Sequence, residues 1–209
     1  MIFIGVDPGA SGGIATIGMG PPEFARAWSM PATERDLWHL LVRINGEAIE
    51  RELLPFLSLE KVGPMPGQGV TSMFSFGQNY GTLRGMIIAL CVPFEDVLPR
   101  VWQKAVGAVL PPGNKRVKDM DKREKNARRQ ARMSLTKSVA QQLFPGLRVT
   151  HATAAALLIA EACRRKHASE PLLAPSPAPP PPDVGTLAVV APLEDRWEAI
   201  TFPADLDIP

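Results

Sequence analysis

The chain has 209 residues, of which 45% are hydrophobic, and a formal net charge of only +2. This length suits one domain with an appendage, and the apolar fraction is sufficient for a buried core. The two cysteines, Cys91 and Cys163, exclude a disulfide framework and a CxxC pair, and with three histidines and no cysteine cluster we do not expect a structural zinc site.

The first residues carry no sign of a targeting segment. No basic region precedes the early apolar run, and Asp7 interrupts that run, so the chain does not begin with the pattern of a secretory signal. No apolar stretch approaches the length of a membrane span. We therefore expect a cytoplasmic protein without a membrane partner.

Residues 1–17 predict a β-hairpin at the centre of a sheet. A nearly unbroken apolar run leads to Asp7, a glycine-rich turn follows, and a second apolar run returns. A carboxylate among isoleucine and valine side chains is costly unless something offsets its charge. Asp7 is therefore a candidate metal ligand, and the alternative is that it only caps the Pro8-Gly9 bend.

A second carboxylate follows in a similar setting. Residues 24–30 predict a third strand, Thr33 and Asp36 mark a helix start, and Pro55 is expected to end that region. Residues 56–62 predict a short buried strand that carries Glu60 in the middle of apolar neighbours. Two carboxylates on neighbouring central strands can share a hard divalent cation, which prefers oxygen ligands.

The next predicted helix contains Gly77, Gly81 and Gly85, one every fourth residue. Glycine weakens a helix, so the repeat suggests that another helix or a DNA backbone approaches closely. Tight packing inside the protein is the alternative. Residues 93–99 then predict an edge strand, and a short helix follows from Val101.

Basic side chains dominate residues 115–137 of an otherwise nearly neutral chain. Such a run is usually a solvated helix face, but the strength of this imbalance favours binding of phosphate groups. Its later part has a helical pattern, and residues 149–162 then predict a long, alanine-rich, buried helix. The candidate DNA-binding residues in the basic segment are Lys115, Arg116, Lys118, Lys122, Arg123, Lys125, Arg128, Arg129 and Arg132.

Taken in order, these motifs resemble the RuvC-like Holliday junction resolvases of the RNase H-like superfamily, in particular the bacteriophage and prophage members. Each motif is weak alone, but the ordered set spans roughly residues 1–165. The motifs are Gly5-Val6-Asp7-Pro8-Gly9, Leu59-Glu60-Lys61-Val62, Met65-Pro66-Gly67-Gln68-Gly69, Phe76-Gly77, Trp102-Gln103-Lys104, Leu143-Phe144-Pro145-Gly146 and Ala156-Leu157-Leu158-Ile159-Ala160.

The resemblance implies an α/β fold of the RNase H-like type, with a mixed five-stranded sheet flanked by helices. It also implies a homodimer that binds four-way or other branched DNA and hydrolyses phosphodiesters with two Mg²⁺ or Mn²⁺ ions. By the same resemblance, Asp7 would bridge the two metals, Glu60 would bind one of them, and the loop with Gln68 would face the junction.

The chain departs from this family at the start of the last helix. Ala152 and Ala155 stand where acidic ligands are expected, at the spacing that places two residues on one helix face. His151 remains as a possible ligand or a plain surface residue, and Glu161 is expected on the wrong face. Either the alanines are engineered, or the chain is a naturally weakened member of the family.

Two functions therefore stay open at this point, a junction endonuclease and a branched-DNA-binding protein that no longer cuts. A third, an actin-like kinase, also uses a phosphate-cradling turn after a strand aspartate. That fold needs two related halves, and this chain has no second such turn and is too short.

The composition changes abruptly near residue 170. We expect a nuclease domain over residues 1–168, a stiff Pro-rich linker over 169–185, and a tail over 186–209 that pairs as a hairpin. A lone hairpin is marginal in water, so the tail is expected to dock on a partner subunit or on the sheet edge. Its acidic end, Asp205 to Pro209, also resembles the tip of bacterial single-stranded DNA-binding proteins, which leaves recruitment of a protein partner open.

Overall fold

The computed structural model describes residues 1–19, 25–63, 69–112 and 120–168, all within the unit Met1–Glu170. The Pro-rich linker, the C-terminal tail and four of the candidate DNA-binding residues lie outside the described residues. Those four are Gln68, Lys115, Arg116 and Lys118.

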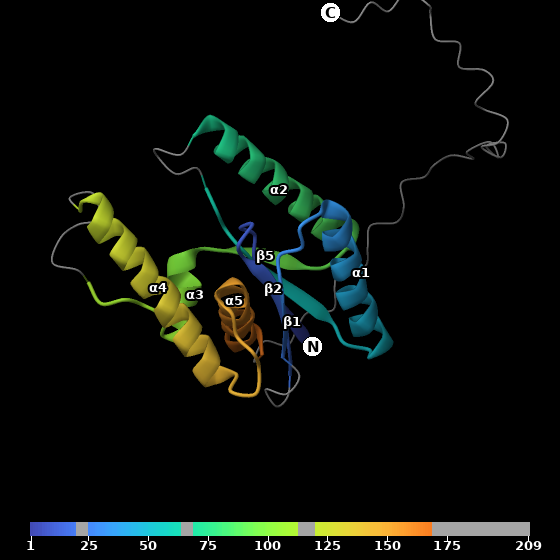
Figure 1. The fold of residues 1–209 in the computed structure, drawn as a ribbon. Helices are drawn as coiled ribbons and strands as arrows, with labels where there is room; N and C mark the ends of the chain where they lie inside the picture. The colour runs from blue at the N-terminus through green and yellow to red at the C-terminus, as the bar shows by residue number, and fades with distance from the viewer. Residues whose placement is uncertain (20–24, 64–68, 113–119, 169–209) are drawn as a thin grey trace, which may run out of the picture. The chain divides into compact units, whose positions relative to one another are not determined.

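Five strands form one sheet in the order β3-β2-β1-β4-β5 (Figure 1). Strand β1 pairs antiparallel with β2 and parallel with β4, so the sheet is mixed. This order and these directions confirm the predicted α/β fold with a mixed five-stranded sheet flanked by helices. The strands are β1 Ile2–Asp7, β2 Gly13–Gly18, β3 Arg26–Ser29, β4 Pro55–Glu60 and β5 Phe94–Val97, and the helices are α1 Glu34–Glu50, α2 Val70–Ala89, α3 Pro99–Val106, α4 Lys122–Leu143 and α5 His151–His167.

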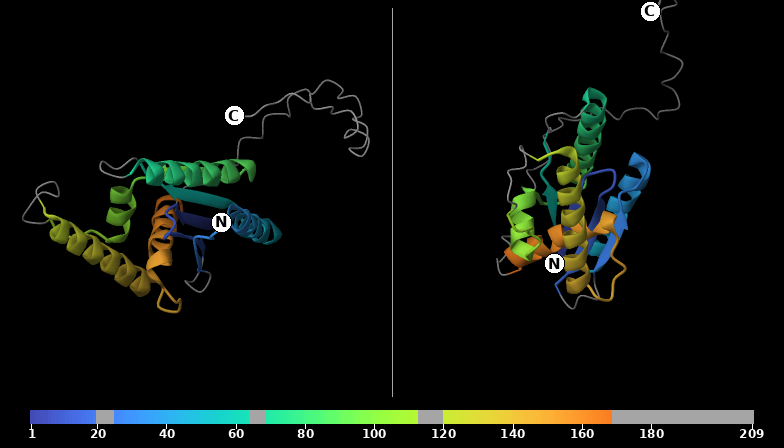
Figure 2. Two further views of the ribbon diagram at one scale, coloured as in Figure 1. Left: turned by 45° about the horizontal axis from the view of Figure 1, so that its top comes forward. Right: turned by 60° about the vertical axis from the view of Figure 1, so that its left-hand side comes forward.

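The helices cover the two faces of the sheet unequally. Ile4 and Val6 of β1 and Leu57 of β4 belong to one apolar core with α1 and α2. The second core is built around α5, with α3 and α4 outside it. Figure 2 shows α2 and α5 on opposite sides of the sheet. Alternate residues of each strand therefore face α5.

Helix α5 lies unusually close to the central strand. A Cβ atom added to Gly5 of β1 would stand 2.2 Å from the Ala156 carbonyl oxygen and 2.3 Å from the Ala160 nitrogen. The alanine-rich sequence of α5 and the glycine of β1 thus allow backbone to approach backbone. This contact fixes the start of α5 beside the end of β1.

The predicted helix signals are largely confirmed, but the expected role of Pro55 is wrong. The Thr33 hydroxyl accepts a hydrogen bond from the Asp36 backbone N–H at 3.1 Å and begins α1. Helix α1 ends at Glu50, and Pro55 is the first residue of β4. A proline fits there because a strand's first position tolerates a missing donor. Strand β4 ends at Glu60, two residues before the predicted end at Val62.

No helix within the described part of the chain combines the length and the apolar character that crossing a membrane requires.

Candidate active site

Asp7 and Glu60 end two adjacent parallel strands. Val6 of β1 pairs with Leu59 of β4, so the next residue on each strand stands beside the other. Gly5 packs against α5, and strand alternation places Asp7 on that same face. Ser58 hydrogen bonds Cys163 of α5, so Glu60 also shares that face. The register therefore directs both carboxylates to one side of the sheet.

Both carboxylates line a single cleft of about 760 Å³. Its walls come from the ends of β1 and β4 and from all helices except α1. Acidic, basic and aromatic side chains line this cleft. The lining includes Asp7, Ser11, Glu60, Lys61, Phe76, Trp102, Gln103, Arg129, Arg132, Met133, Thr136, His151 and Ala155.

Asp7 caps the bend that follows β1, which is the alternative to a role as metal ligand. Its Oδ1 atom accepts a hydrogen bond from the Gly9 backbone N–H at 3.2 Å, so it does cap the bend. Burial nevertheless raises the pKa of Asp7, although the Gly9 bond opposes that rise. A Cβ atom on Gly12 would lie 2.7 Å from Asp7 Cγ. The glycine-rich turn thus leaves room for the carboxyl group.

Glu60 is the more strongly perturbed carboxyl group. Burial and the charge of Asp7 raise its pKa from 4.5 to about 7, while the Trp102 hydrogen bond and the charge of Arg132 lower it. The Trp102 indole N–H donates to Glu60 Oε1 at 2.9 Å. Trp102 is only 2% exposed and belongs to the α5 core. It therefore holds the carboxyl group in a fixed orientation.

These two carboxylates suit a divalent cation. Among the described residues, no salt bridge reaches Asp7 or Glu60. Two like charges side by side in a partly buried place favour protonation unless a cation offsets them. Carboxylate oxygens are the ligands that Mg²⁺ prefers in proteins. The donor set and the raised pKa values therefore fit the expected metal.

The first turn of α5 offers one further ligand. His151 is exposed and lines the cleft, as does Ala155, whereas Ala152 is absent from the lining. The ligand atoms of Asp7, Glu60 and His151 do not form a group within 4.8 Å of one another. Glu161 lies elsewhere, since it forms ion pairs with Arg164 at 2.8 Å and Arg165 at 2.7 Å. Glu161 is therefore not among the residues that line the cleft.

Basic residues of α4 extend from the cleft along the surface. Arg129 and Arg132 line the cleft and also line a second hollow of about 380 Å³, together with Lys125 and Arg128. Lys122 and Arg123 occupy the exposed first turn of α4. The described basic residues of α4 thus form a cationic surface that reaches the two carboxylates at Arg129 and Arg132.

Two features of the molecule were not predicted from the sequence. Trp102 belongs to the motif Trp102-Gln103-Lys104, but its hydrogen bond to Glu60 depends on tertiary packing and has no signal in the sequence. Glu95, Cys163 and His167 form a second cluster of metal-ligating side chains. The spacing of Cys163 and His167, four residues apart in a helical segment, is a signal that could have identified part of it.

Comparison with known proteins gives a limited result. No protein-family model matches the chain, and no curated protein matches it. Among solved structures, RuvC of Thermus thermophilus in complex with a Holliday junction substrate is 12% identical, with a TM-score of 0.46, over 78% of this chain and 91% of that one. A second Thermus thermophilus RuvC structure is 14% identical, with a TM-score of 0.44, over 78% and 92%. Because both TM-scores are below 0.5, the fold is assigned from the strand order and strand directions of this chain.

Proposed function

We propose that this chain is a metal-dependent, structure-selective DNA endonuclease that acts on Holliday junctions or other branched DNA. The observation that carries the proposal is the cleft in which Asp7 and Glu60 meet arginines of α4. Paired carboxylates can bind the cations that promote phosphodiester hydrolysis, and adjacent arginines can bind the polyanion. The sequence motifs support the choice of branched DNA, and the assignment to the bacteriophage type rests on them alone.

In this proposal each cleft residue has a defined task. Asp7 and Glu60 hold Mg²⁺ or Mn²⁺, and His151 is the additional ligand from α5. The metal would activate a water and stabilise the leaving oxygen. Trp102 orients the Glu60 carboxyl group through its 2.9 Å hydrogen bond. Arg129 and Arg132 position the phosphate backbone at the mouth of the cleft.

A catalytically silent branched-DNA-binding protein is the second candidate function. It is favoured by the alanine at position 155, which lines the cleft where the family resemblance calls for an acidic ligand. Since Ala152 is absent from that lining, position 155 is the better place to restore a carboxylate. The cationic surface would serve binding equally well in either function.

Nicking and binding assays on a four-way junction separate these functions. An endonuclease is expected to nick the junction with Mn²⁺ or Mg²⁺, and Asp7→Asn is expected to abolish nicking while binding is retained or tightened. If the original chain binds but does not nick, Ala155→Asp is expected to create nicking, with Ala152→Asp as the matched comparison. If the wild type and both carboxylate variants bind the junction but none of them nicks it, the protein is a branched-DNA-binding protein without nuclease activity.

We also propose that the protein acts as a homodimer through one face of α2. Val70, Phe74 and Ile88 are 85%, 66% and 60% exposed. Helical geometry places them on the same face as Gly77 and Gly81. Beyond the adjacent backbone of α2 itself, no described atom lies within 4 Å of a Cβ built on Gly77, Gly81 or Gly85. These glycines have open space around them and lie beside exposed apolar side chains. Such a surface suits close packing against a second copy of the chain.

Gly81→Leu tests this surface without disturbing the protomer. A Cβ atom at this position meets no described atom within 4 Å beyond the adjacent backbone of its own helix, so the substitution is expected to separate subunits while leaving each one folded. Gly46→Leu on α1 is the matched control, because that helical glycine is equally uncrowded. Sedimentation analysis is expected to show monomer only for Gly81→Leu. A dimer that persists in this variant would argue against the α2 interface.

A further inference from the structure

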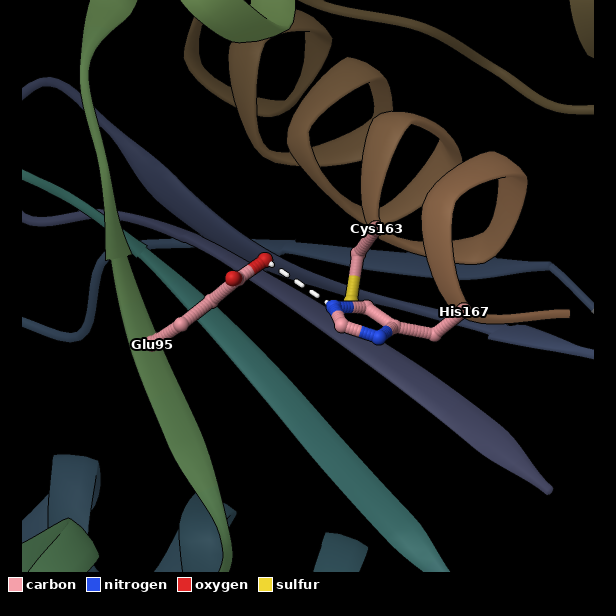
Figure 3. Close-up of side chains that lie close together, drawn as sticks. All are labelled: Glu95, Cys163 and His167. Atoms are coloured by element: carbon pink, nitrogen blue, oxygen red, sulfur yellow. Dashed lines mark hydrogen bonds and ion pairs between the residues drawn. The ribbon is translucent and has the colours of Figure 1, made fainter. Parts of the chain in front are cut away.

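The side chains of Glu95, Cys163 and His167 converge at the C-terminal end of α5. Figure 3 shows Glu95 reaching from β5 toward Cys163 and His167 on the helix. One ligand atom from each residue lies within 4.8 Å of the other two. Cys163 and His167 are 2% and 8% exposed. The cluster is therefore partly enclosed and brings thiol, imidazole and carboxylate to one point.

The spacing within this cluster is compatible with tetrahedral coordination. His167 Nε2 lies 3.3 Å from Glu95 Oε1. Two ligands at the zinc–nitrogen and zinc–oxygen distances of about 2.0–2.1 Å, at tetrahedral angles, stand roughly 3.3 Å apart. A sulfur at about 2.3 Å from the ion stands roughly 3.6 Å from the imidazole nitrogen. The cysteine sulfur now lies within 4.8 Å of the other two ligand atoms, so a small movement brings it to this distance.

Neighbouring groups already hold the three ligands in place. The Ser58 hydroxyl donates to Glu95 Oε1 at 3.0 Å, and the Lys166 ammonium pairs with Oε2. The Phe56 ring packs on His167, with ring centroids 4.4 Å apart. Partners of this kind orient metal ligands and raise metal affinity. Phe56 and Ser58 come from β4, which lies between β1 and β5 in the sheet, and Lys166 comes from α5.

We propose that Glu95, Cys163 and His167 bind one divalent transition-metal ion of the Zn²⁺ class. A thiolate, an imidazole and a carboxylate form a donor set that suits zinc and cobalt better than magnesium. The fourth tetrahedral position takes a water. The ion fastens the end of α5 to β5, and the metal replaces the direct hydrogen bond between His167 and Glu95.

This site is separate from the carboxylate cleft. His151, which lines the cleft, begins α5 and His167 ends it. The two residues are 16 helical steps apart, which corresponds to a distance of roughly 24 Å at 1.5 Å per residue. The cleft offers oxygen ligands and one exposed imidazole, whereas this cluster supplies a thiol. The two sites therefore select different metals and can be tested independently.

The thiol must lose its proton when metal binds. Burial, opposed by the Ser58 hydrogen bond and assisted by the Glu95 charge, raises the pKa of Cys163 to about 12. Without a metal, Cys163 is thus a neutral thiol beside the ion pair of Glu95 and Lys166. No described buried side-chain polar atom lacks a hydrogen-bond partner. Metal binding releases that proton to solvent.

Co²⁺ binding to the full-length chain tests the proposal directly. The protein carries Cys91→Ser, because Cys91 is an exposed thiol that would bind metal nonspecifically. One equivalent of Co²⁺ is expected to produce a thiolate-to-cobalt charge-transfer band, which Zn²⁺ then removes. Carboxylate-bound Co²⁺ in the cleft gives no such band, so the signal reports this site alone.

Ligand variants and matched controls then define the site. Cys163→Ser is expected to lose the band, and His167→Gln and Glu95→Gln to raise the half-saturating Co²⁺ concentration at least about tenfold. The two glutamine variants keep hydrogen-bonding side chains, so they remain folded if Cys163→Ser does not. His39→Gln, at an exposed position on α1, and Asp7→Asn are expected to leave the titration unchanged.

The proposal fails if excess Co²⁺ gives no charge-transfer band. It also fails if the band survives in Cys163→Ser, or if neither His167→Gln nor Glu95→Gln weakens Co²⁺ binding. A band that Asp7→Asn removes would place the metal in the cleft and overturn the separate site.

Discussion

Replacing Glu60 by glutamine is expected to stabilise the metal-free protein at neutral pH. Burial and the charge of Asp7 raise the Glu60 pKa to about 7, so the folded protein resists ionisation of this group. Glutamine has the same shape, and its carbonyl oxygen can still accept the Trp102 hydrogen bond. It removes the charge that is costly in the absence of a cation.

The size and direction of the effect follow from the pKa difference. The rise from 4.5 to about 7 corresponds to a ceiling of about 3 kcal/mol, at 1.36 kcal/mol per pKa unit. Between these pH values the folded state holds more protons than the unfolded state, so stability falls as pH rises. The contribution is fully present below pH 4.5 and is lost above about 7. Glutamine does not titrate, and its advantage therefore develops across this interval.

Urea unfolding in EDTA at pH 4.5 and pH 8 measures this difference. Similar unfolding free energies are expected at the lower pH, and at the higher pH the variant is expected to exceed wild type by up to about 3 kcal/mol. Mn²⁺ is expected to narrow the gap, because only the folded wild type binds the cation well. Glu50→Gln, on the exposed end of α1, controls for the change in net charge. A Glu60→Gln advantage that is the same at both pH values, or absent at pH 8, would refute the reasoning.

Three further predictions concern packing, DNA binding and the tail. Gly5→Ala is expected to lower the free energy of unfolding by at least about 1–3 kcal/mol in urea melts, because its Cβ would overlap the α5 backbone; an unchanged melt would contradict that close contact. Replacing Arg129 and Arg132 together by glutamine should weaken binding to all DNA sequences alike and flatten the salt dependence by about one unit per lost phosphate contact; an unaltered slope would make this surface a solvated face. Deleting residues 171–209 is expected to lower the melting temperature or shift the dimer equilibrium, and a truncated chain unchanged in both would favour recruitment of a partner.

The sequence determined most of the local structure. Two nearly unbroken apolar runs and a glycine-rich turn between them specify the β1–β2 hairpin, because these signals act over a few neighbouring residues. Thr33 and Asp36 locate the start of α1 for the same reason. Asp7 and Glu60 could be selected as candidates because an acidic side chain in an apolar strand is costly. The missing acidic ligands at Ala152 and Ala155 could likewise be read from the sequence by family resemblance.

Tertiary structure decided how these pieces combine. The parallel register of β1 and β4 sets Asp7 beside Glu60, and this register depends on contacts between residues far apart in the chain. Packing of α3 brings the Trp102 indole to Glu60, and packing of α5 directs Ala155 into the cleft. Cys163 and His167 meet Glu95 only because the packed fold brings the end of α5 to the side chain of Glu95 on β5. Sequence spacing specifies neighbours along one element, whereas a site built from several elements exists only once the whole core has packed.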